Sequence, residues 1–373
     1  MTAMELYIHI PFCARKCAYC DFLSFPADED TKEAYARALI REIHLAREPL
    51  GKRITSVFFG GGTPSLLPAQ LTVAVLEELG KRYVLSSDAE ISMEVNPGTV
   101  SSQSLKLWHR AGINRLSIGL QSPRDEELRM LGRIHSFAQF KTCFAMAREA
   151  GFGNLNLDLM FGLPGQSCQS WEESLRLSAA FAPEHISAYS LIIEEGTPFA
   201  RMRLQLPDED TEYEMYDMTD RVLSEYGYRQ YEISNYSLPG RECRHNLGYW
   251  EREEYLGFGL GAASLVGHTR FSNTRSLKEY LAADGDPRIC RKETEVLTES
   301  DEMAEFVFLG MRKRKGIRDE DFQSCFGRSI WEVYAAPLKK YLTLGLISCE
   351  GGSIALTRPG IHVSNRVFSD FLQ

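Results

Sequence analysis

Three cysteines lie close together near the start of the chain, at a spacing suited to binding a metal centre. Cys13, Cys17 and Cys20 follow the pattern C-x3-C-x2-C within eight residues. A fully ligated [4Fe–4S] cluster takes four cysteine thiolates, so three on one loop leave one iron with an open coordination position. Open positions are where metal sites carry out chemistry. The triad therefore predicts an iron–sulfur cluster that binds a further molecule at its open iron.

A structural zinc site with a distant fourth ligand, or plain surface thiols, is the alternative for this triad. Zinc-binding cysteines usually occur as C-x2-C together with a second such pair, and the sequence has no second pair. Disulfides are not expected in a reducing compartment. The six remaining cysteines are scattered, and most of them are expected to be buried small side chains: Cys143, Cys168, Cys243, Cys290, Cys325 and Cys349.

Strand-like apolar runs alternate with helix-like segments over the first ~230 residues, and these elements must position the cysteines. Six such units indicate parallel strands with helices outside them. The fold class expected is α/β: a partial (β/α)6 barrel, similar to a TIM barrel, with a doubly wound sheet as the other arrangement that fits. The strands are expected at 6–10, 56–59, 90–95, 115–119, 156–160 and 186–191, and the helices at 32–47, 68–82, 101–111, up to 150, 170–181 and 210–226.

Turn residues follow several of these strands. Gly60-Gly61-Gly62, Asn96-Pro97-Gly98 and Gly162-Leu163-Pro164-Gly165 come directly after the second, third and fifth strands. The cysteine loop likewise follows the first strand. In βα proteins the functional face lies at the carboxyl ends of the strands. We therefore expect the chemically active residues to gather at that face.

The cysteine spacing resembles the signature of the radical S-adenosylmethionine (SAM) superfamily. Three segments narrow the resemblance: Tyr7-Ile8-His9-Ile10-Pro11-Phe12-Cys13, Phe59-Gly60-Gly61-Gly62-Thr63-Pro64-Ser65 and Gly162-Leu163-Pro164. Over essentially the whole chain they are similar to the family of the oxygen-independent coproporphyrinogen III dehydrogenase. This resemblance implies a [4Fe–4S] cluster on the three cysteines and SAM on its open iron, where one electron cleaves SAM to a 5′-deoxyadenosyl radical.

The resemblance also assigns residues to SAM. Glu94 and Asp158, at the ends of strands three and five, would accept hydrogen bonds from the ribose hydroxyls. Arg133, in the helical segment after strand four, would meet the SAM carboxylate. The other residues that the resemblance assigns to SAM lie in the glycine motif, in or beside the cluster loop and near the ends of strands four and six: Gly61, Gly62, Thr63, Tyr7, Tyr19, Gln121, Tyr189 and Ile192. No catalytic residue is assigned.

Two departures from the dehydrogenase disfavour the decarboxylation of coproporphyrinogen propionates. The dehydrogenase carries one more cysteine two residues after the triad, where this chain has Phe22. It also has a long N-terminal extension, whereas six residues precede Tyr7 here. Both features are similar to the heme chaperone subgroup of the same family. That subgroup implies heme as cargo and heme-requiring proteins, such as respiratory cytochromes, as partners. Whether SAM is cleaved in normal function is left open.

A second motif supports a tetrapyrrole ligand. His245-Asn246-Leu247-Gly248-Tyr249-Trp250 matches the H-N-x-x-Y-W motif of the heme chaperone subgroup. Neutral imidazole is a common axial ligand of heme iron, and Tyr and Trp rings can stack on a porphyrin. Cys243 is a second conceivable iron ligand. The alternative is that His245 is a structural histidine packed among aromatic side chains.

The domain organisation expected has three parts. Residues 1–230 form the barrel, 231–295 form a connecting region rich in glycine and aromatic residues that contains the H-N-x-x-Y-W motif, and 296–373 form a C-terminal helical domain. In this last part, two apolar runs at 346–349 and 354–356 flank Gly351-Gly352, which indicates a hairpin. Short helices plus one hairpin resemble a winged-helix arrangement.

The bulk properties exclude several classes of function. The net charge is −9 and the basic run Arg312-Lys313-Arg314-Lys315 is short, typical of a solvated helix end, so a nucleic-acid partner is not expected. No stretch approaches the ~20 apolar residues of a membrane span, and the N-terminus lacks the pattern of a signal peptide. We therefore expect a cytoplasmic protein. A homodimer and a peripheral contact with the membrane are both compatible with heme delivery to respiratory proteins.

Overall fold

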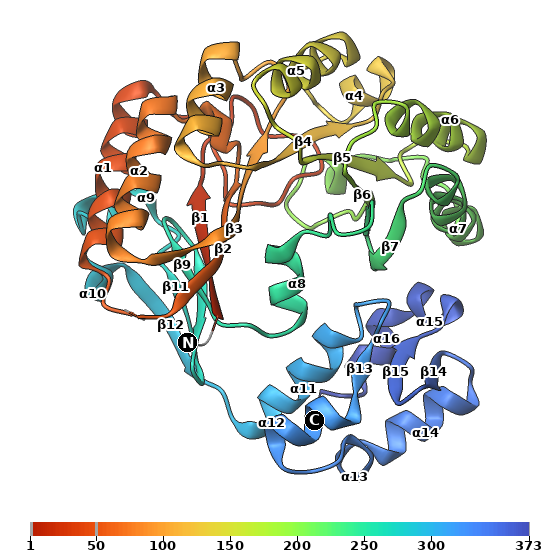
Figure 1. Ribbon diagram of the computed structural model, residues 1–373. Coiled ribbons are helices and arrows are strands. Elements are labelled where there is room, and N and C mark those ends of the chain that lie inside the picture. Colours follow the sequence, from red (N-terminus) through yellow and green to blue (C-terminus); the bar gives the residue numbers. More distant parts are fainter. Residues whose placement is uncertain (1–2, 49–50, 373) are drawn as a thin grey trace.

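The computed structural model describes residues 3–48 and 51–372, and a curved sheet is its central element (Figure 1). Six parallel strands stand side by side in chain order, which confirms the predicted partial barrel. These strands are β1 (Ala3–Ile10), β2 (Arg53–Gly61), β3 (Val84–Val95), β4 (Arg115–Gln121), β5 (Leu155–Phe161) and β6 (His185–Ser190).

Helices between and after these strands cover the convex side of the sheet (Figure 1). Sequence signals set several of their starts, because a serine side chain caps α3, α5 and α6 in a complete capping box. The helices are α1 (Glu29–Leu45), α2 (Ala69–Arg82), α3 (Ser102–Ala111), α4 (Asp125–Met130), α5 (Phe137–Glu149), α6 (Cys168–Ala179) and α7 (Glu209–Glu225), with the 3-10 turns η1 (Pro64–Leu66) and η2 (Phe199–Arg201).

The helical segment predicted to end at 150 is two helices, α4 and α5, so the placement of Arg133 in a helix was wrong. Gly132 has φ = 75° and ends the first helix. At this point the chain meets the cysteine loop, where the backbone N–H of Ala18 donates to the carbonyl of Leu131 at 3.0 Å. Arg133 therefore lies in the loop between the helices, beside the cysteines.

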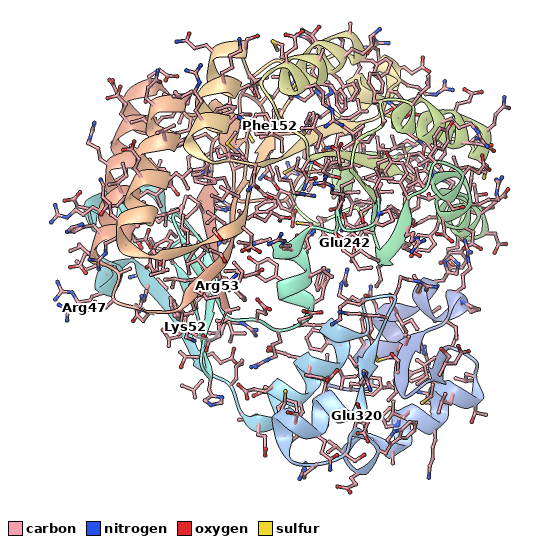
Figure 2. All side chains as sticks on the ribbon, viewed as in Figure 1. Arg47, Lys52, Arg53, Phe152, Glu242 and Glu320 are labelled. Carbon is pink, nitrogen blue, oxygen red and sulfur yellow. The ribbon has the colours of Figure 1, made fainter. Side chains whose placement is uncertain are left out.

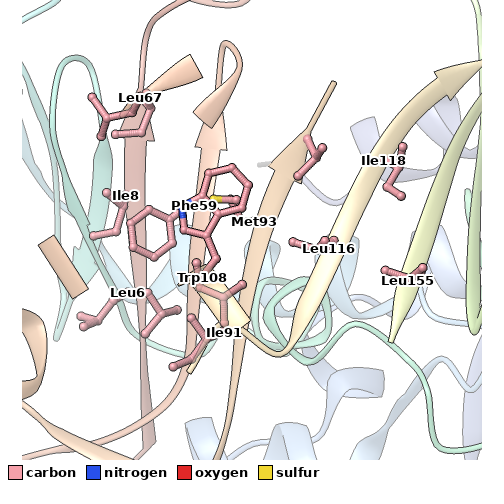
Figure 3. Packing of buried hydrophobic residues seen from close by; sticks show 14 of the residues in the cluster. Leu6, Ile8, Phe59, Leu67, Ile91, Met93, Trp108, Leu116, Ile118 and Leu155 are labelled. Carbon is pink, nitrogen blue, oxygen red and sulfur yellow. The ribbon is translucent and has the colours of Figure 1, made fainter. Parts of the chain in front are cut away.

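Alternation along the strands decides which side chains face the hollow of the sheet. Leu6, Ile8, Met93 and Leu157 are buried in the core between the sheet and the outer helices, where Trp108 of α3 also packs (Figure 3). Because neighbouring residues of a strand point to opposite faces, the residues between them in sequence face the concave side. Three of the predicted site residues, Tyr7, Glu94 and Asp158, are among these concave residues, together with His9.

Residues 231–295 extend the same sheet at both edges, which makes it twelve-stranded within the described residues. On one side, β8 pairs antiparallel with β6, and β7 pairs antiparallel with β8. On the other side, β9 pairs parallel with β1, and β10, β11 and β12 follow, each antiparallel to its neighbour. The added elements are β7 (Arg229–Glu232), β8 (Asn235–Ser237), α8 (Arg244–Trp250), β9 (Tyr255–Phe258), β10 (Ala263–Val266), β11 (Thr269–Asn273), α9 (Leu277–Ala282), α10 (Pro287–Cys290) and β12 (Arg291–Val296).

Helix α8 carries the H-N-x-x-Y-W motif and lies inside the curve of the sheet, at the end away from the cysteine loop (Figure 1). The Glu90 carboxylate of β3 accepts from the first backbone N–H groups of α8, those of Arg244 at 3.2 Å and His245 at 3.5 Å. A carboxylate at a helix N-terminus satisfies N–H groups that have no partner within the helix. This contact fixes α8 as the floor of the barrel.

The C-terminal part has its own core around Val307, Phe322, Leu338 and Val367. The predicted hairpin is present and pairs with a third strand. No helix of residues 3–48 or 51–372 is long and apolar enough to cross a membrane. The elements are α11 (Glu299–Gly310), β13 (Ile317–Arg318), α12 (Asp319–Phe326), α13 (Ile330–Val333), α14 (Ala335–Thr343), β14 (Ile347–Glu350), β15 (Ser353–Leu356), α15 (Arg358–His362) and α16 (Ser364–Ser369).

Contacts of the segment around α8 join the barrel to this C-terminal part. Arg252 donates to Glu302 at 2.8 Å and to Glu305 at 2.9 Å, both on α11. The Arg312 guanidinium lies over the Trp250 ring, 4.3 Å from its centre. These ion pairs and this cation–π contact attach the C-terminal part to the segment around α8. The motif helix is therefore packed between the sheet and the C-terminal part.

Candidate functional site

The cysteine loop follows the carboxyl end of β1, as predicted. It closes on itself through backbone hydrogen bonds from Cys13 to Phe25 and from Phe25 to Pro11, at 3.0 and 2.9 Å. His9 supports the loop from below, because its Nε2 donates to the Leu23 carbonyl at 3.0 Å. The three cysteines sit on a loop that is pinned at its base and partly exposed at its tip.

The three thiols are free and half-buried. Within the described part of the chain, no three His, Cys, Asp or Glu side chains converge as ligands of a single metal ion. A cubane cluster makes a different demand, because each thiolate binds a different iron atom and the sulfurs stay further apart. The donor set of three cysteines on one loop therefore fits a [4Fe–4S] cluster: Cys13, Cys17 and Cys20 would hold it, with one iron left open.

Glycines let the turn after β2 approach the cysteine loop. A Cβ on Gly62 would lie 2.7 Å from the carbonyl oxygen of Phe12, closer than real Cβ contacts allow. Gly61 has φ = 115°, and a Cβ there would meet the His9 ring at 2.6 Å. The Thr63 hydroxyl, next along the turn, lies 3.4 Å from the Cys13 sulfur. The glycine motif thus packs directly against the loop that carries the cysteines.

One cavity of about 400 Å³ opens beside the three thiols at the carboxyl ends of the strands. Its volume is in the range of small-molecule and cofactor sites. Every predicted cluster and SAM residue except Tyr7 lines it: Cys13, Cys17, Tyr19, Cys20, Gly61, Gly62, Thr63, Glu94, Gln121, Arg133, Asp158, Tyr189 and Ile192. Tyr7 lies deeper, with its hydroxyl 3.0 Å from His9 Nδ1.

Two half-buried carboxylates, Glu94 and Asp158, face this cavity. Burial, followed by the nearby charge of Asp158, raises the pKa of Glu94 to about 8, although the Gly61 N–H donates to it at 3.1 Å. Burial also raises the pKa of Asp158, which accepts from Ser117 at 3.0 Å and from Asn156 at 2.8 Å. Asp158 lies in the middle of β5 rather than at its end. Carboxylates with few internal donors are suited to accept hydrogen bonds from a ligand's hydroxyl groups.

Arg133 points from the α4–α5 loop toward the cysteines. Its guanidinium donates to Asn96 at 2.5 Å, to the Gly119 carbonyl at 2.7 Å and to the Cys17 sulfur at 3.6 Å, while Nε has no partner in the described residues. A fixed cation beside the cluster loop is suited to a ligand carboxylate. The two polar groups that fix it, Asn96 and a backbone carbonyl, were not singled out from the sequence, where Asn96-Pro97-Gly98 indicated only a turn.

Gln121 occupies a backbone conformation that few residues with a side chain adopt. Its φ is 65°, and it ends β4 at the edge of the cavity. Such residues concentrate at functional sites because the surrounding structure must impose them. The strain supports a role for the carboxyl end of β4 in holding a ligand.

His245 lies away from this cavity, in the floor of the barrel. It is 1% exposed, its ring stacks on Phe58, and both of its nitrogens are engaged. Nδ1 is 2.7 Å from the Ser56 hydroxyl and Nε2 is 3.1 Å from the Tyr249 hydroxyl. Burial lowers the pKa of His245 to about 3, so the ring is neutral. The role of His245 as a heme ligand stays a prediction. For heme iron to bind Nε2, the hydrogen bond between Nε2 and the Tyr249 hydroxyl must first break.

Comparisons with known proteins show the family of the chain. Residues 7–178 match the family model described as the Radical SAM superfamily, and residues 297–363 match the HemN C-terminal domain. The chain is 37% identical over 372 residues to the "Heme chaperone HemW" of Bacillus subtilis (strain 168), covering 98% of both chains. The chain belongs to the HemW family.

Other relatives of this HemW-family chain include the Escherichia coli (strain K12) "Heme chaperone HemW", 40% identical over 71% of each chain. A mouse protein, "Radical S-adenosyl methionine domain-containing protein 1, mitochondrial", is 33% identical over 97% of this chain and 86% of its own. The solved structure of the Escherichia coli coproporphyrinogen III oxidase HemN has a TM-score of 0.87 at 24% identity, covering 99% of this chain and 90% of that one. This likeness concerns the fold.

Membership of the radical SAM superfamily implies a [4Fe–4S] cluster and SAM as cofactors of the HemW-family chain. When bound, the cluster supplies one electron to SAM. In this arrangement the three thiolates would hold the cluster, Arg133 would offer a cation for the SAM carboxylate, and Glu94 and Asp158 would offer acceptors for its hydroxyls.

Proposed function

We propose that this chain binds heme and delivers it to heme-requiring proteins, respiratory cytochromes among them, while it holds a [4Fe–4S] cluster and SAM. The observation that carries the proposal is the similarity, over 98% of both chains, to a protein named heme chaperone HemW. Phe22 supports it, because this apolar side chain is 63% exposed and lines the SAM cavity where the dehydrogenase has a fourth cysteine. Delivery, unlike decarboxylation, needs no extra redox group there.

A cavity of about 440 Å³ between α8, the β9–β11 extension and α11 is the proposed heme site. This volume lies within the range of cofactor pockets. Several aromatic rings line the wall: Tyr249 and Tyr255 meet edge to face with ring centres 4.8 Å apart, and Trp250 is also in the lining. Flat apolar ligands are held well by such rings.

Tyr249 separates this cavity from His245. Its ring lines the cavity, and its hydroxyl occupies His245 Nε2 at 3.1 Å. We propose that heme entry displaces the Tyr249 hydroxyl, after which the neutral imidazole becomes an axial ligand. Cys243 is the weaker candidate, because its thiol points to Glu90, 3.4 Å away, and not to Tyr249 at the cavity wall.

Heme titration of the cluster-reconstituted protein tests this proposal. The expected result is one heme per chain, with a Soret band that changes in His245→Ala. His109→Ala is the matched control, since His109 is an exposed histidine on α3, outside both cavities. An unchanged Soret band and affinity in His245→Ala would remove His245 as the ligand, and the absence of stoichiometric heme binding by the wild type would overturn the proposed function.

Anaerobic turnover with coproporphyrinogen III, SAM and a reductant tests the competing activity. Under the proposal, mass spectrometry finds no accumulation of protoporphyrinogen. Repeated turnover to protoporphyrinogen would instead make the chain a dehydrogenase.

The cellular location, the oligomeric state and the contact with the membrane are also part of the proposal. We propose a cytoplasmic location, a homodimer that depends on the cluster, and peripheral contact with the membrane during delivery to respiratory proteins. Analytical ultracentrifugation of apo and reconstituted protein tests the dimer: equal sedimentation of the two forms would contradict the dependence on the cluster.

A further inference from the structure

A second, smaller cavity lies beneath the SAM cavity, inside the barrel. It measures about 190 Å³ and shares Glu94, Ser117, Asp158 and Tyr189 with the SAM cavity above. At ~30 Å³ per molecule it has room for about six waters. A porphyrin ring does not fit in such a space, whereas a small organic molecule does. The side chains of the barrel interior are drawn in Figure 2.

Arg115, at the start of β4, brings a buried positive charge to this cavity. It lines the cavity and is 2% exposed. Within the described residues its one side-chain hydrogen bond is a long one, from Nη1 to the Ser92 hydroxyl at 3.5 Å. Nε has no partner in the described residues, although the charges of Glu90 and Asp158 act on the guanidinium. An arginine has five N–H donors, and burying its charge without a partner is costly.

The two carboxylates whose charges act on Arg115 also accept hydrogen bonds from other groups. Glu90 accepts from the first N–H groups of α8, and Asp158 accepts from Ser117 and Asn156. Asn246, the asparagine of the H-N-x-x-Y-W motif, lines the same cavity from the floor. The walls of this small cavity therefore include both the incompletely paired guanidinium of Arg115 and the polar amide of Asn246.

We propose that this cavity binds the carboxylate of a small organic acid, held by Arg115 and assisted by Asn246. Carboxylate is the group that the arginine fork matches best. The acid would lie directly below the SAM cavity, against the carboxylates assigned to the ribose. This cavity shares Tyr7 and Tyr249 with the proposed heme cavity and is also lined by His245, but binding of the acid does not require heme.

Equilibrium dialysis of the heme-free protein with radiolabelled propionate tests the site. The expected result is one propionate per chain, which an excess of propionamide, the uncharged analogue of the same shape, does not displace. Displacement by propionamide, or the absence of saturable binding by the wild type, overturns the proposal. Heme titration, performed separately, reports on the proposed function alone.

Two variants place the binding in this cavity. Arg115→Gln removes the cation, and Asn246→Asp fills the space beside Arg115 with a carboxylate of the chain itself; each is expected to weaken propionate binding at least about tenfold. The second variant keeps the test valid if the first does not fold. Arg110→Gln, an exposed arginine of α3, is the control and is expected to bind like the wild type. Unchanged propionate binding in a folded Arg115→Gln or Asn246→Asp protein overturns the assignment.

Discussion

The His245 imidazole and the Tyr249 hydroxyl, one turn apart on α8, share a hydrogen bond of 3.1 Å. Ser56 donates to Glu5 at 3.0 Å, so its oxygen accepts from the Nδ1–H of His245 at 2.7 Å. Nε2 is then the acceptor, and Tyr249 donates to it. The nitrogen that would bind heme iron is therefore held by a residue of the same motif.

Replacing Tyr249 with Phe is expected to strengthen heme binding. The substitution keeps the ring that lines the heme cavity and removes the hydroxyl that competes for His245 Nε2. A neutral hydrogen bond contributes about 0.5–1.5 kcal/mol, so the affinity should rise roughly 2- to 10-fold. Titration followed at the Soret band measures this change. Weaker binding would mean that the Tyr249 hydroxyl itself contacts heme.

Replacing Cys17 with Ala is expected to abolish the open-site cluster, since two thiolates do not hold a cubane. The measurement is iron content per chain, together with the charge-transfer absorbance after anaerobic reconstitution. Cys349→Ser, at an exposed thiol on β14, is the matched control and should reconstitute fully. Normal iron content in Cys17→Ala would refute the ligand assignment.

Replacing Gly62 with Ala is expected to disturb the cysteine loop. The new methyl group would lie 2.7 Å from the Phe12 carbonyl, so the turn or the loop must move. Overpacking of this kind costs about 1–3 kcal/mol of stability, and cluster yield should fall with it. Gly80→Ala is the control: it sits in α2 with open space around it and should be neutral or stabilising. Chemical denaturation compares the two variants.

The carboxyl group of Glu94 should make the stability of the SAM-free protein depend on pH. Burial raises its pKa from 4.5 to about 8, so the folded protein binds this proton more tightly than the unfolded chain. Its stabilising contribution is therefore complete below pH 4.5 and is lost as the pH rises to about 8. Urea unfolding between about pH 5 and pH 8 should show a smaller decline in Glu94→Gln than in the wild type. Identical declines would show that Glu94 is ionised in the folded protein.

Sequence patterns were sufficient for the local elements and for the ligand types. Strand and helix periodicity predicted the six βα units, and the turns that follow the strands located the face where Cys13, Glu94 and Asp158 now share one cavity. The predicted helix between β4 and β5 was wrong in one respect. It is interrupted at Gly132, where the chain contacts the cysteine loop, and Arg133 therefore lies beside the cysteines. The periodicity of a segment reflects that segment alone, so it does not predict a contact between two distant segments.

By itself, the sequence determined which groups are present for the chemistry: three cysteines with an open position, a glycine turn, and polar residues at alternating strand positions. Only the tertiary structure decided where the H-N-x-x-Y-W motif packs, because two partners of His245, Ser56 and Phe58, are far away in the chain. The same holds for Arg115, which the sequence places in an ordinary strand. Burial and incomplete hydrogen bonding arise when distant strands close around a side chain, and no local pattern encodes them.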